Sequence, residues 1–204
     1  GAGISLGALA SIGIKAAAEF EQAEVALTTM FGSAEKDKSL LADLSKFAAE
    51  TPFEFPELFQ SAKLLAGFGF EAGNIIPTLR QIGDISSGVG VSIKELAEIY
   101  GRASVQGRLF SRDIYEFQGR GINIIKELAN QFGVTEGAVM SLVEKGQVNF
   151  GHLQKAFESL TAEGGRFHNA MADQSQTLVG LWSTTKDNLT YVLRDIALEL
   201  INTF

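Results

Sequence analysis

Apolar residues recur at helical spacing in the first fifty positions of the chain. Between Phe20 and Phe31 they lie on one helical face and predict a long first helix. Gly32 then supplies the left-handed conformation at which helices commonly end. A second helix is predicted from Leu40 to Ala48, and it has to end by Thr51 because the residue before a proline is pushed out of the helical region.

Prolines and glycines divide the next stretch. Pro56 suits the first turn of a third helix, and a fourth helix is predicted around Pro77 to Ser87, after a break at Gly67–Gly73. Ser92 is followed three residues later by Glu95, the spacing of a capping box in which each side chain bonds the other residue's backbone N–H. A further helix is therefore predicted to begin there.

The middle of the chain predicts short helices. Four residues that favour helix N-caps each precede a short apolar-periodic run, namely Ser111, Asn123, Thr135 and Asn149. No stretch alternates apolar and polar residues between Asn-Gly or Asp-Gly turns, so a sheet is not supported. The predicted fold is all-α, with about eight to ten helices, in which long first and last helices flank short central helical hairpins.

We expect four segments along the chain. They are a long N-terminal helix (1–33), a helical subdomain (34–110), a short-helix subdomain (111–174) and a C-terminal helix leading into a coiled-coil-like region (175–204). The chain begins without Met and ends inside a helical pattern, so we expect both ends to be cuts through a longer polypeptide.

The C-terminal segment carries a heptad pattern. Its apolar seam, at alternating spacings of four and three, consists of Leu178, Trp182, Thr185, Leu189, Val192 and Ile196. Such a seam favours self-association through a coiled coil that continues beyond Phe204. Packing of the same face on the rest of the domain explains the pattern equally well, because it covers fewer than three full heptads.

A phenylalanine-rich corner is the second candidate for protein contacts. It comprises Phe53, Phe55, Phe59, Phe68 and Phe70, which lie among glycines and prolines. Burial of each ring contributes on the order of 1.5 to 3 kcal/mol, so most of them are expected in the core. Any ring left exposed would form an apolar patch of the kind that marks a protein contact.

Composition narrows the classes of partner. The 204 residues carry 46% hydrophobic side chains, enough for a core, and a formal net charge of −7, which argues against binding through phosphate neutralisation. Four arginines lie close together in the sequence, at Arg102, Arg108, Arg112 and Arg120. Because acidic residues lie among them, we interpret them as ordinary surface charge. The uncharged run Gly1–Ile14 is too short to cross a bilayer, so membrane contact would need residues upstream of this chain.

The residues give no support for catalysis. His152 and His168 are the only histidines, the chain has no cysteine, and neither histidine has a partner at metal-ligand spacing on a shared helix. Neither a Gly-x-Ser-x-Gly nucleophile turn nor a Gly-Lys phosphate loop is present. We therefore expect no enzyme activity, no cofactor and no metal.

The stretch Leu128–Val139 has the spacing of a helix-turn-helix, with Gly133 at the turn and Thr135 at the second N-cap. The second helix, Glu136–Glu144, offers two acids and none of the Arg, Lys, Asn or Gln side chains that read bases. A compact helical hairpin is therefore preferred over DNA readout. A non-enzymatic interaction or regulatory module remains the alternative function.

The order of motifs along nearly the whole chain resembles the tape measure domain in the N-terminal region of bacteriophage and prophage tail tape measure proteins. The matching motifs are Phe20-Glu21, Thr51-Pro52-Phe53, Ile82-Gly83-Asp84, Gly107-Arg108 leading to Asp113 and Phe117, Gly121-Ile122, Leu128-Ala129, Gly146, Thr161, Gly164-Gly165-Arg166-Phe167, Met171 and Ser175-x-Thr177-x-x-Gly180. Asn123 departs from the family, which often shows a proline after the Gly-Ile pair.

The resemblance implies a structural virion protein of a phage or prophage tail, a scaffold around which tube subunits assemble and whose length sets tail length. It implies the virion tail as location, with the host cytoplasm during assembly. The implied partners are the tail tube, a baseplate or initiator protein and tail assembly chaperones. Because glycines and prolines interrupt the helices, this segment cannot be one continuous rod. We call the polypeptide whose length sets tail length the ruler, and we expect this segment to be a folded domain, or station, along it.

Overall fold

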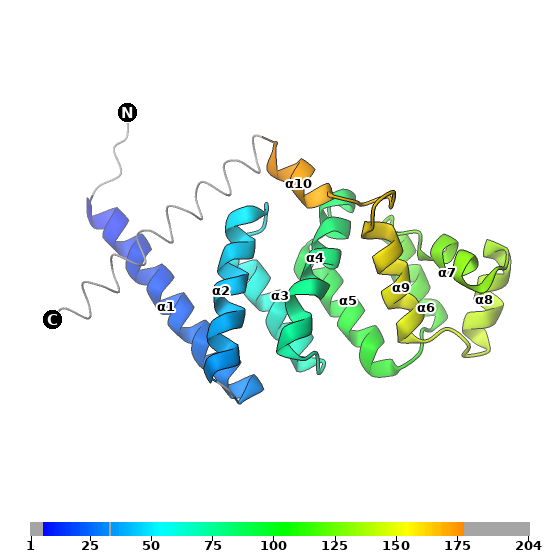
Figure 1. Cartoon of the computed structure of the whole chain (residues 1–204), viewed down its shortest axis with the longest axis horizontal. Helices are drawn as coiled ribbons and strands as arrows, with labels where there is room; N and C mark the ends of the chain where they lie inside the picture. Colours follow the sequence, from blue (N-terminus) through cyan, green and yellow to red (C-terminus); the bar gives the residue numbers. More distant parts are fainter. Residues whose placement is uncertain (1–5, 33, 178–204) are drawn as a thin grey trace. The chain divides into compact units, whose positions relative to one another are not determined.

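The computed structural model describes residues 6–32 and 34–177, and in that part of the chain every regular element is a helix (Figure 1). The helices are α1 (Leu6–Phe31), α2 (Ala34–Glu50), α3 (Phe55–Gly67), α4 (Ala72–Val89), α5 (Ile93–Gln106), α6 (Ser111–Gly119), α7 (Ile124–Phe132), α8 (Glu136–Glu144), α9 (Phe150–Thr161) and α10 (Ala170–Ser175). The all-α prediction is confirmed.

Backbone contacts divide the chain into two compact units. Of the described residues, 6–32, 34–59 and 175–177 belong to unit 1, and 60–174 belong to unit 2. The division into four segments stays a prediction.

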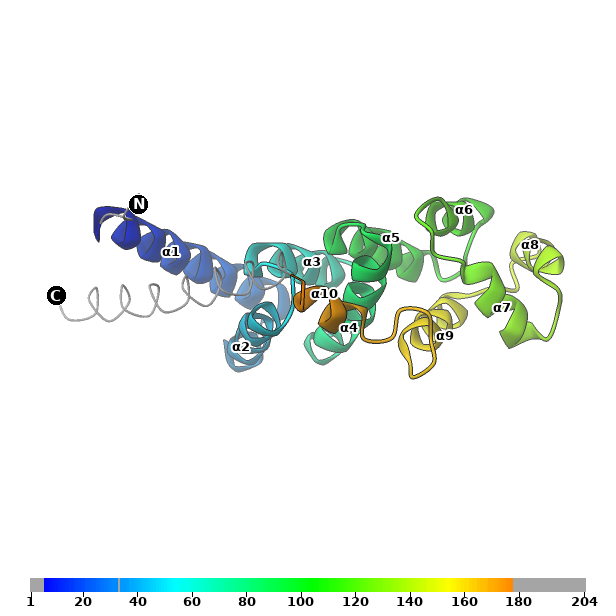
Figure 2. The same ribbon diagram turned by 90° about the horizontal axis from the view of Figure 1, so that it is seen from above.

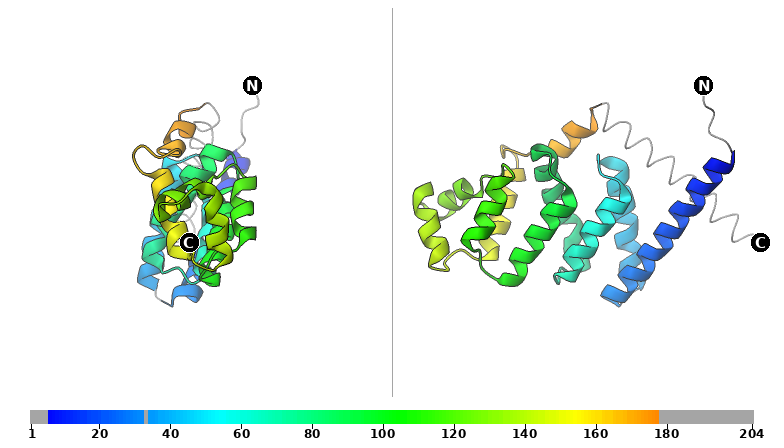
Figure 3. Two further views of the ribbon diagram at one scale, coloured as in Figure 1. Left: turned by 90° about the vertical axis from the view of Figure 1, so that its right-hand side faces the viewer. Right: turned by 180° about the vertical axis from the view of Figure 1, so that it is seen from behind.

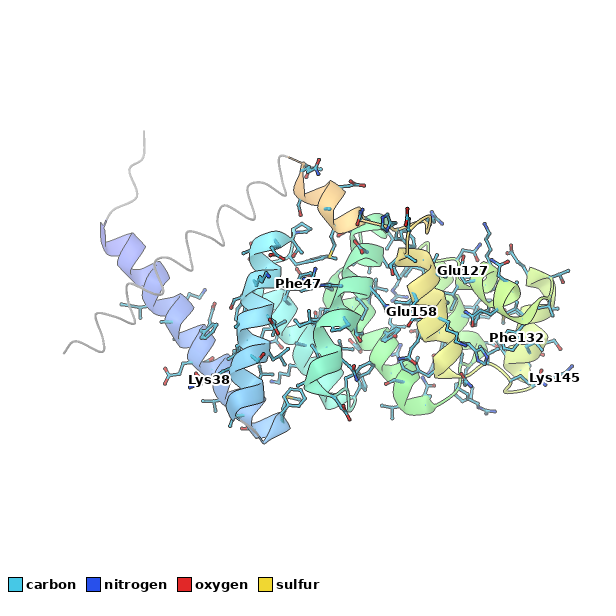
Figure 4. The ribbon with its side chains drawn as sticks, in the orientation of Figure 1. Lys38, Phe47, Glu127, Phe132, Lys145 and Glu158 are labelled. Carbon is cyan, nitrogen blue, oxygen red and sulfur yellow. The ribbon has the colours of Figure 1, made fainter. Side chains whose placement is uncertain are left out.

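Unit 1 is built on the packing of α1 against α2. The side chains that α1 and α2 bury are Ala17, Ala23, Leu27, Leu40, Leu41, Leu44, Phe47 and Ala48. Gly32 adopts a φ of 67° at the end of α1, as its position predicts. Outside the apolar contact, Nζ of Lys38 in α2 lies 3.9 Å from Oε1 of Glu24 in α1. Figure 4 labels Lys38 and Phe47, both on α2.

The core of unit 2 is a cluster of aromatic rings enclosed by α4, α5 and α9, which pack against one another. Tyr100 of α5 lies at its centre, with ring centroids 5.1 Å from Phe150 and 4.7 Å from Phe157 of α9. Phe117 of α6 meets Phe157 edge-on at 5.5 Å, a geometry that aromatic pairs prefer. Figures 2 and 3 show these helices from above, from the side and from behind.

The short helices of unit 2 pack on one another and on the helices that enclose the aromatic core. Helix α7 packs on both α8 and α9, and α6 packs on α5, α7 and α8. The loops before α6 and α9 are joined by an isolated antiparallel bridge between Arg108 and Asn149, with the N–H of Leu109 donating to the carbonyl of Val148 at 2.8 Å. This bridge holds the start of α6 beside the start of α9.

The fourth helix begins earlier than predicted. Helix α4 starts at Ala72, so Pro77 lies inside it rather than near its beginning. Proline has no backbone N–H, so the helix lacks the one hydrogen bond that residue 77 would donate to the carbonyl of Gly73. Ile75 and Leu79 are fully buried, and their packing outweighs the lost bond.

The predicted capping box at Ser92 is wrong, although α5 does begin directly after Ser92. The Ser92 side chain makes no capping hydrogen bond, and the Glu95 carboxylate instead accepts from the guanidinium of Arg120 at 2.7–2.8 Å. A capping box forms at α9, where the Asn149 side chain accepts from the N–H of His152 and the His152 ring accepts from the N–H of Asn149.

Candidate protein-contact surfaces

The phenylalanines of unit 1 serve internal packing. Phe53 and Phe55 are buried, and Phe59 is half-buried. The Phe55 ring stacks between those of Phe20 and Phe59, with centroid distances of 5.7 and 6.2 Å. A contact role for these rings stays a prediction.

Phe68 and Phe70 belong to unit 2, and both are half-buried. Phe68 lies against Gly101, where a Cβ on the glycine would stand 2.1 Å from the nearest ring atom. Phe70 borders the aromatic core, 6.1 Å from the Tyr100 ring. Neither ring is among the strongly exposed apolar side chains, so their contact role also stays a prediction.

The predicted contact seam of the C-terminal segment lies outside the described residues. This applies to Leu178, Trp182, Leu189, Val192 and Ile196.

Two of the four arginines, Arg102 and Arg120, join α5 and α6 through ion pairs. Arg102 of α5 pairs with Glu116 of α6, and Arg120 pairs with Glu95 at the other end of the two helices. Arg112 reaches Glu116 at 3.9 Å but is itself mostly exposed. Arg102, Arg112 and Arg120 thus have acidic partners, and the interpretation of the four arginines as ordinary surface charge stays a prediction.

Three exposed apolar side chains lie close in sequence to these ion-paired residues. Val105 is 66% exposed one turn after Arg102, and Tyr115 is 61% exposed next to Glu116. Phe110 is 39% exposed, and the Arg108 guanidinium lies 4.5 Å above its ring centre. We call the set Arg102, Val105, Arg108, Phe110, Arg112 and Tyr115 the α5–α6 surface. Arginine and aromatic side chains of this kind are enriched at protein interfaces.

Sequence reasoning missed the apolar members of the α5–α6 surface, although a signal was present. Val105 falls on the side of α5 opposite the buried residues Tyr100 and Ala103. Tyr115 directly follows buried Ile114 in α6 and so points another way. A helical wheel for each helix would have found both.

The hairpin of α7 and α8 has the predicted local form. Leu128, Ala129 and Val139 are buried, and Gly133 has a φ of 63° at the turn. The acidic side chains Glu136 and Glu144 of α8 are exposed. Helix α7 is tied to α9, because the Ser159 hydroxyl donates to Glu127 at 2.7 Å and the Phe132 ring lies 4.6 Å from that of His152 (Figure 4).

The histidines have structural surroundings. His152 belongs to the α9 capping box, and burial, together with the nearby charge of Lys155, lowers the pKa of its ring. A neutral ring is the form that can accept the Asn149 N–H. Over residues 6–32 and 34–177, no group of three or more His, Cys, Asp or Glu side chains is placed to hold a metal ion. In the same ranges no helix is long and apolar enough to cross a membrane.

Many of the motif residues quoted above for the family resemblance determine the fold of unit 2. Asp113 is buried and accepts the N–H of Phe110 at the start of α6. Gly121 has a φ of 80°, and Gly165 lies so close to the end of α9 that a Cβ would stand 2.4 Å from the carbonyl oxygen of Ser159. Phe167 is buried against Gly88. These motif residues set backbone turns and buried contacts of unit 2.

Comparison with protein families gives one result. A model of the family described as tape measure protein matches residues 11–197. Comparisons with curated proteins and with solved structures gave no significant match.

Proposed function

This chain belongs to the tape measure protein family, and we propose from that membership that it helps to set the length of a phage or prophage tail. The observation that carries the proposal is the family match, which spans residues 11–197. Members of the family are structural phage tail proteins that interact with other tail components. The finer role, determination of tail length, rests on the ruler principle, in which polypeptide length sets tail length.

Within that role, we assign unit 2 to docking rather than to measurement. A continuous helix advances about 1.5 Å per residue, so residues 60–174 as a rod would span about 170 Å. A compact unit of that size has a radius of gyration of about 13 Å. The short helices packed on one aromatic core support a folded station along the ruler, with the measuring length in other helices.

The partners we propose are the tail tube, a baseplate or initiator protein and a tail assembly chaperone. The α5–α6 surface is the best candidate for one of these contacts, because its apolar side chains are exposed beside arginines. Self-association through the seam from Leu178 to Ile196 remains a further proposal. The expected locations are the virion tail and, during assembly, the host cytoplasm.

The experiment uses the phage or prophage that carries the gene. An in-frame insertion of about 100 helix-forming residues after Phe204 should lengthen tails by about 150 Å in electron micrographs. Unchanged tail length would contradict the ruler role. In a second strain that lacks residues 60–174, the station hypothesis expects tails of unchanged length or a failure of assembly. Tails shortened by about 170 Å would show instead that unit 2 measures.

A further inference from the structure

Unit 2 contains a pocket that the proposed function does not use. It lies between α4 and α9, which pack side by side (Figures 1 and 2), and it has a volume of about 240 Å³. Helix α4 contributes one stripe of residues, from Asn74 to Gln81, and α9 contributes Gln154 and Glu158. Pockets for drug-sized ligands begin at about 300 Å³, so this one suits a single side chain.

The floor of the pocket is aromatic. Phe70 and Tyr100 line it, with their ring centroids 6.1 Å apart, and Tyr100 is anchored in the core of unit 2. Burial raises the pKa of the Tyr100 phenol, the charge of Glu158 raises it further, and a side-chain hydrogen bond from Gln154 acts in the opposite direction. The phenol is therefore neutral at physiological pH.

Glu158 is the charged side chain of this pocket; Figure 4 labels it on α9. It is exposed and makes no ion pair with any residue in the described part of the chain. The pocket thus presents a negative charge that has no ion-pair partner among the described residues, and two aromatic rings line the same pocket.

The α4 wall offers further polar groups. The side chains of Asn74, Thr78 and Gln81 line the pocket and have no hydrogen-bond partner within residues 6–32 and 34–177. Their oxygens can accept hydrogen bonds from a ligand. Pro77, on the same wall, has no N–H, so the carbonyl of Gly73 lacks its usual helical donor as well.

We propose that this pocket binds a basic side chain, best an arginine, presented by a protein partner. A guanidinium stacks on aromatic rings and directs its fixed set of N–H donors at carboxylate and carboxamide oxygens. The formal net charge of −7 attracts a positively charged partner over longer distances. An anionic ligand would be repelled by Glu158, and a neutral ligand would leave that charge without a partner.

The test is a titration of the isotope-labelled 204-residue chain, followed by two-dimensional amide NMR. The probes are acetyl-arginine amide and acetyl-citrulline amide, which has nearly the same shape and no charge. The arginine probe should shift the amide signals of residues 74–81 and 154–158, with a Kd on the order of 1 mM, and the citrulline probe should bind at least about tenfold more weakly. Equal binding of both probes, shifts elsewhere on the chain, or no saturation by the arginine probe would overturn the proposal.

Two charge-matched variants complete the test. Glu158→Gln should weaken arginine binding by about tenfold, because a hydrogen bond to a charged group is lost in a partly enclosed site. Glu163→Gln removes an equal charge from an exposed residue that does not line the pocket and should change the Kd by less than about twofold. Equal effects of the two substitutions would refute a specific role of Glu158.

The same amide spectra report whether each variant is folded. The titration does not involve tails, so its result is independent of the proposed role in tail length. A pocket that fails to bind arginine leaves that role untouched.

Discussion

The carboxylate of Asp84 in α4 accepts a hydrogen bond from the backbone N–H of Met171, 87 positions later, at 3.0 Å. Met171 is the second residue of α10, where helix N–H groups have no acceptor within their own helix. Asp84 therefore caps α10 from a distant helix. The Met171 side chain is buried at the same contact, so the hydrogen bond fixes where α10 begins relative to α4.

This contact predicts an unusual pH dependence. Burial raises the pKa of Asp84 above its ordinary value of 3.8, outweighing the Met171 hydrogen bond and the charges of His168 and Arg80, which lower it. Because the folded-state pKa is raised, the stability contributed by Asp84 is present below its unfolded pKa and is lost as the pH rises through the folded pKa. Asp84→Asn keeps an acceptor oxygen but does not ionise. As the pH rises from 3 to 7, the free energy of unfolding of this variant should therefore increase relative to that of the parent, measured by urea unfolding across that range.

Asp84→Ala serves as the matched variant for the hydrogen bond itself. It leaves the Met171 N–H without its acceptor and should lower the free energy of unfolding at pH 7 by about 1–3 kcal/mol. A stability difference between Asp84→Asn and the parent that does not change with pH would contradict the raised pKa.

The contact between Phe68 and Gly101 predicts a steric effect. A Cβ at position 101 would stand 2.1 Å from the Phe68 ring, so Gly101→Ala forces that ring away from α5. The cost of about 1–3 kcal/mol for such overpacking exceeds the roughly 0.5–1 kcal/mol that alanine gains over glycine inside a helix. We expect a net loss of stability in thermal or urea unfolding.

A double-mutant cycle tests the cause. In a Phe68→Ala background the clash is absent, and Gly101→Ala should then be neutral or stabilising. Gly137→Ala is the control, because nothing lies within 4 Å of a Cβ at that helical position, and it should raise stability by up to about 1 kcal/mol. The same loss from Gly101→Ala with and without the Phe68 ring would rule out the proposed clash.

Local sequence rules predicted the helices well, because periodicity and end signals act over a few residues. Gly32 and Gly133 end helices where their left-handed conformations are needed, and Asn149 begins one. The rules failed at Ser92, because the Glu95 carboxylate accepts a hydrogen bond from Arg120 and does not form the expected capping box. That competitor lies 25 positions away, beyond the reach of a local pattern.

The sites were less predictable than the helices for the same reason. The pocket joins the α4 stripe from Asn74 to Gln81 with Glu158 of α9, and no spacing in the sequence links the two. The phenylalanines were easy to notice, but their rings pack inside their own units. Val105 and Tyr115 are exposed apolar residues on their helices, and each lies within one turn of a member of the Arg102–Glu116 ion pair, which the packing of α5 on α6 forms.

Asp113 provides a test of how α6 is held. Its carboxylate is only 1% exposed and accepts the N–H of Phe110 at 2.8 Å. Asp113→Ala removes that acceptor and should lower the free energy of unfolding by about 1–2 kcal/mol, whereas Asp113→Asn retains an acceptor and should lose less. Glu136→Ala, at the exposed first residue of α8, should change stability by no more than about 0.5 kcal/mol. Equal losses from Asp113→Ala and Glu136→Ala would show that the hydrogen bond contributes nothing specific.

The α5–α6 surface predicts a separation of assembly from stability. Val105 and Tyr115 are exposed, so the double variant Val105→Ser with Tyr115→Ser should unfold within about 0.5 kcal/mol of the parent. If the surface contacts another tail component, the same variant should reduce the yield of tails severalfold, counted in electron micrographs of lysates. Val25→Ser, at a residue 63% exposed on α1 in unit 1, is the control and should leave the yield unchanged. Normal tail yield from a stably folded double variant would exclude the α5–α6 surface as a contact, whereas lost yield with lost stability would mean that these two side chains support the fold.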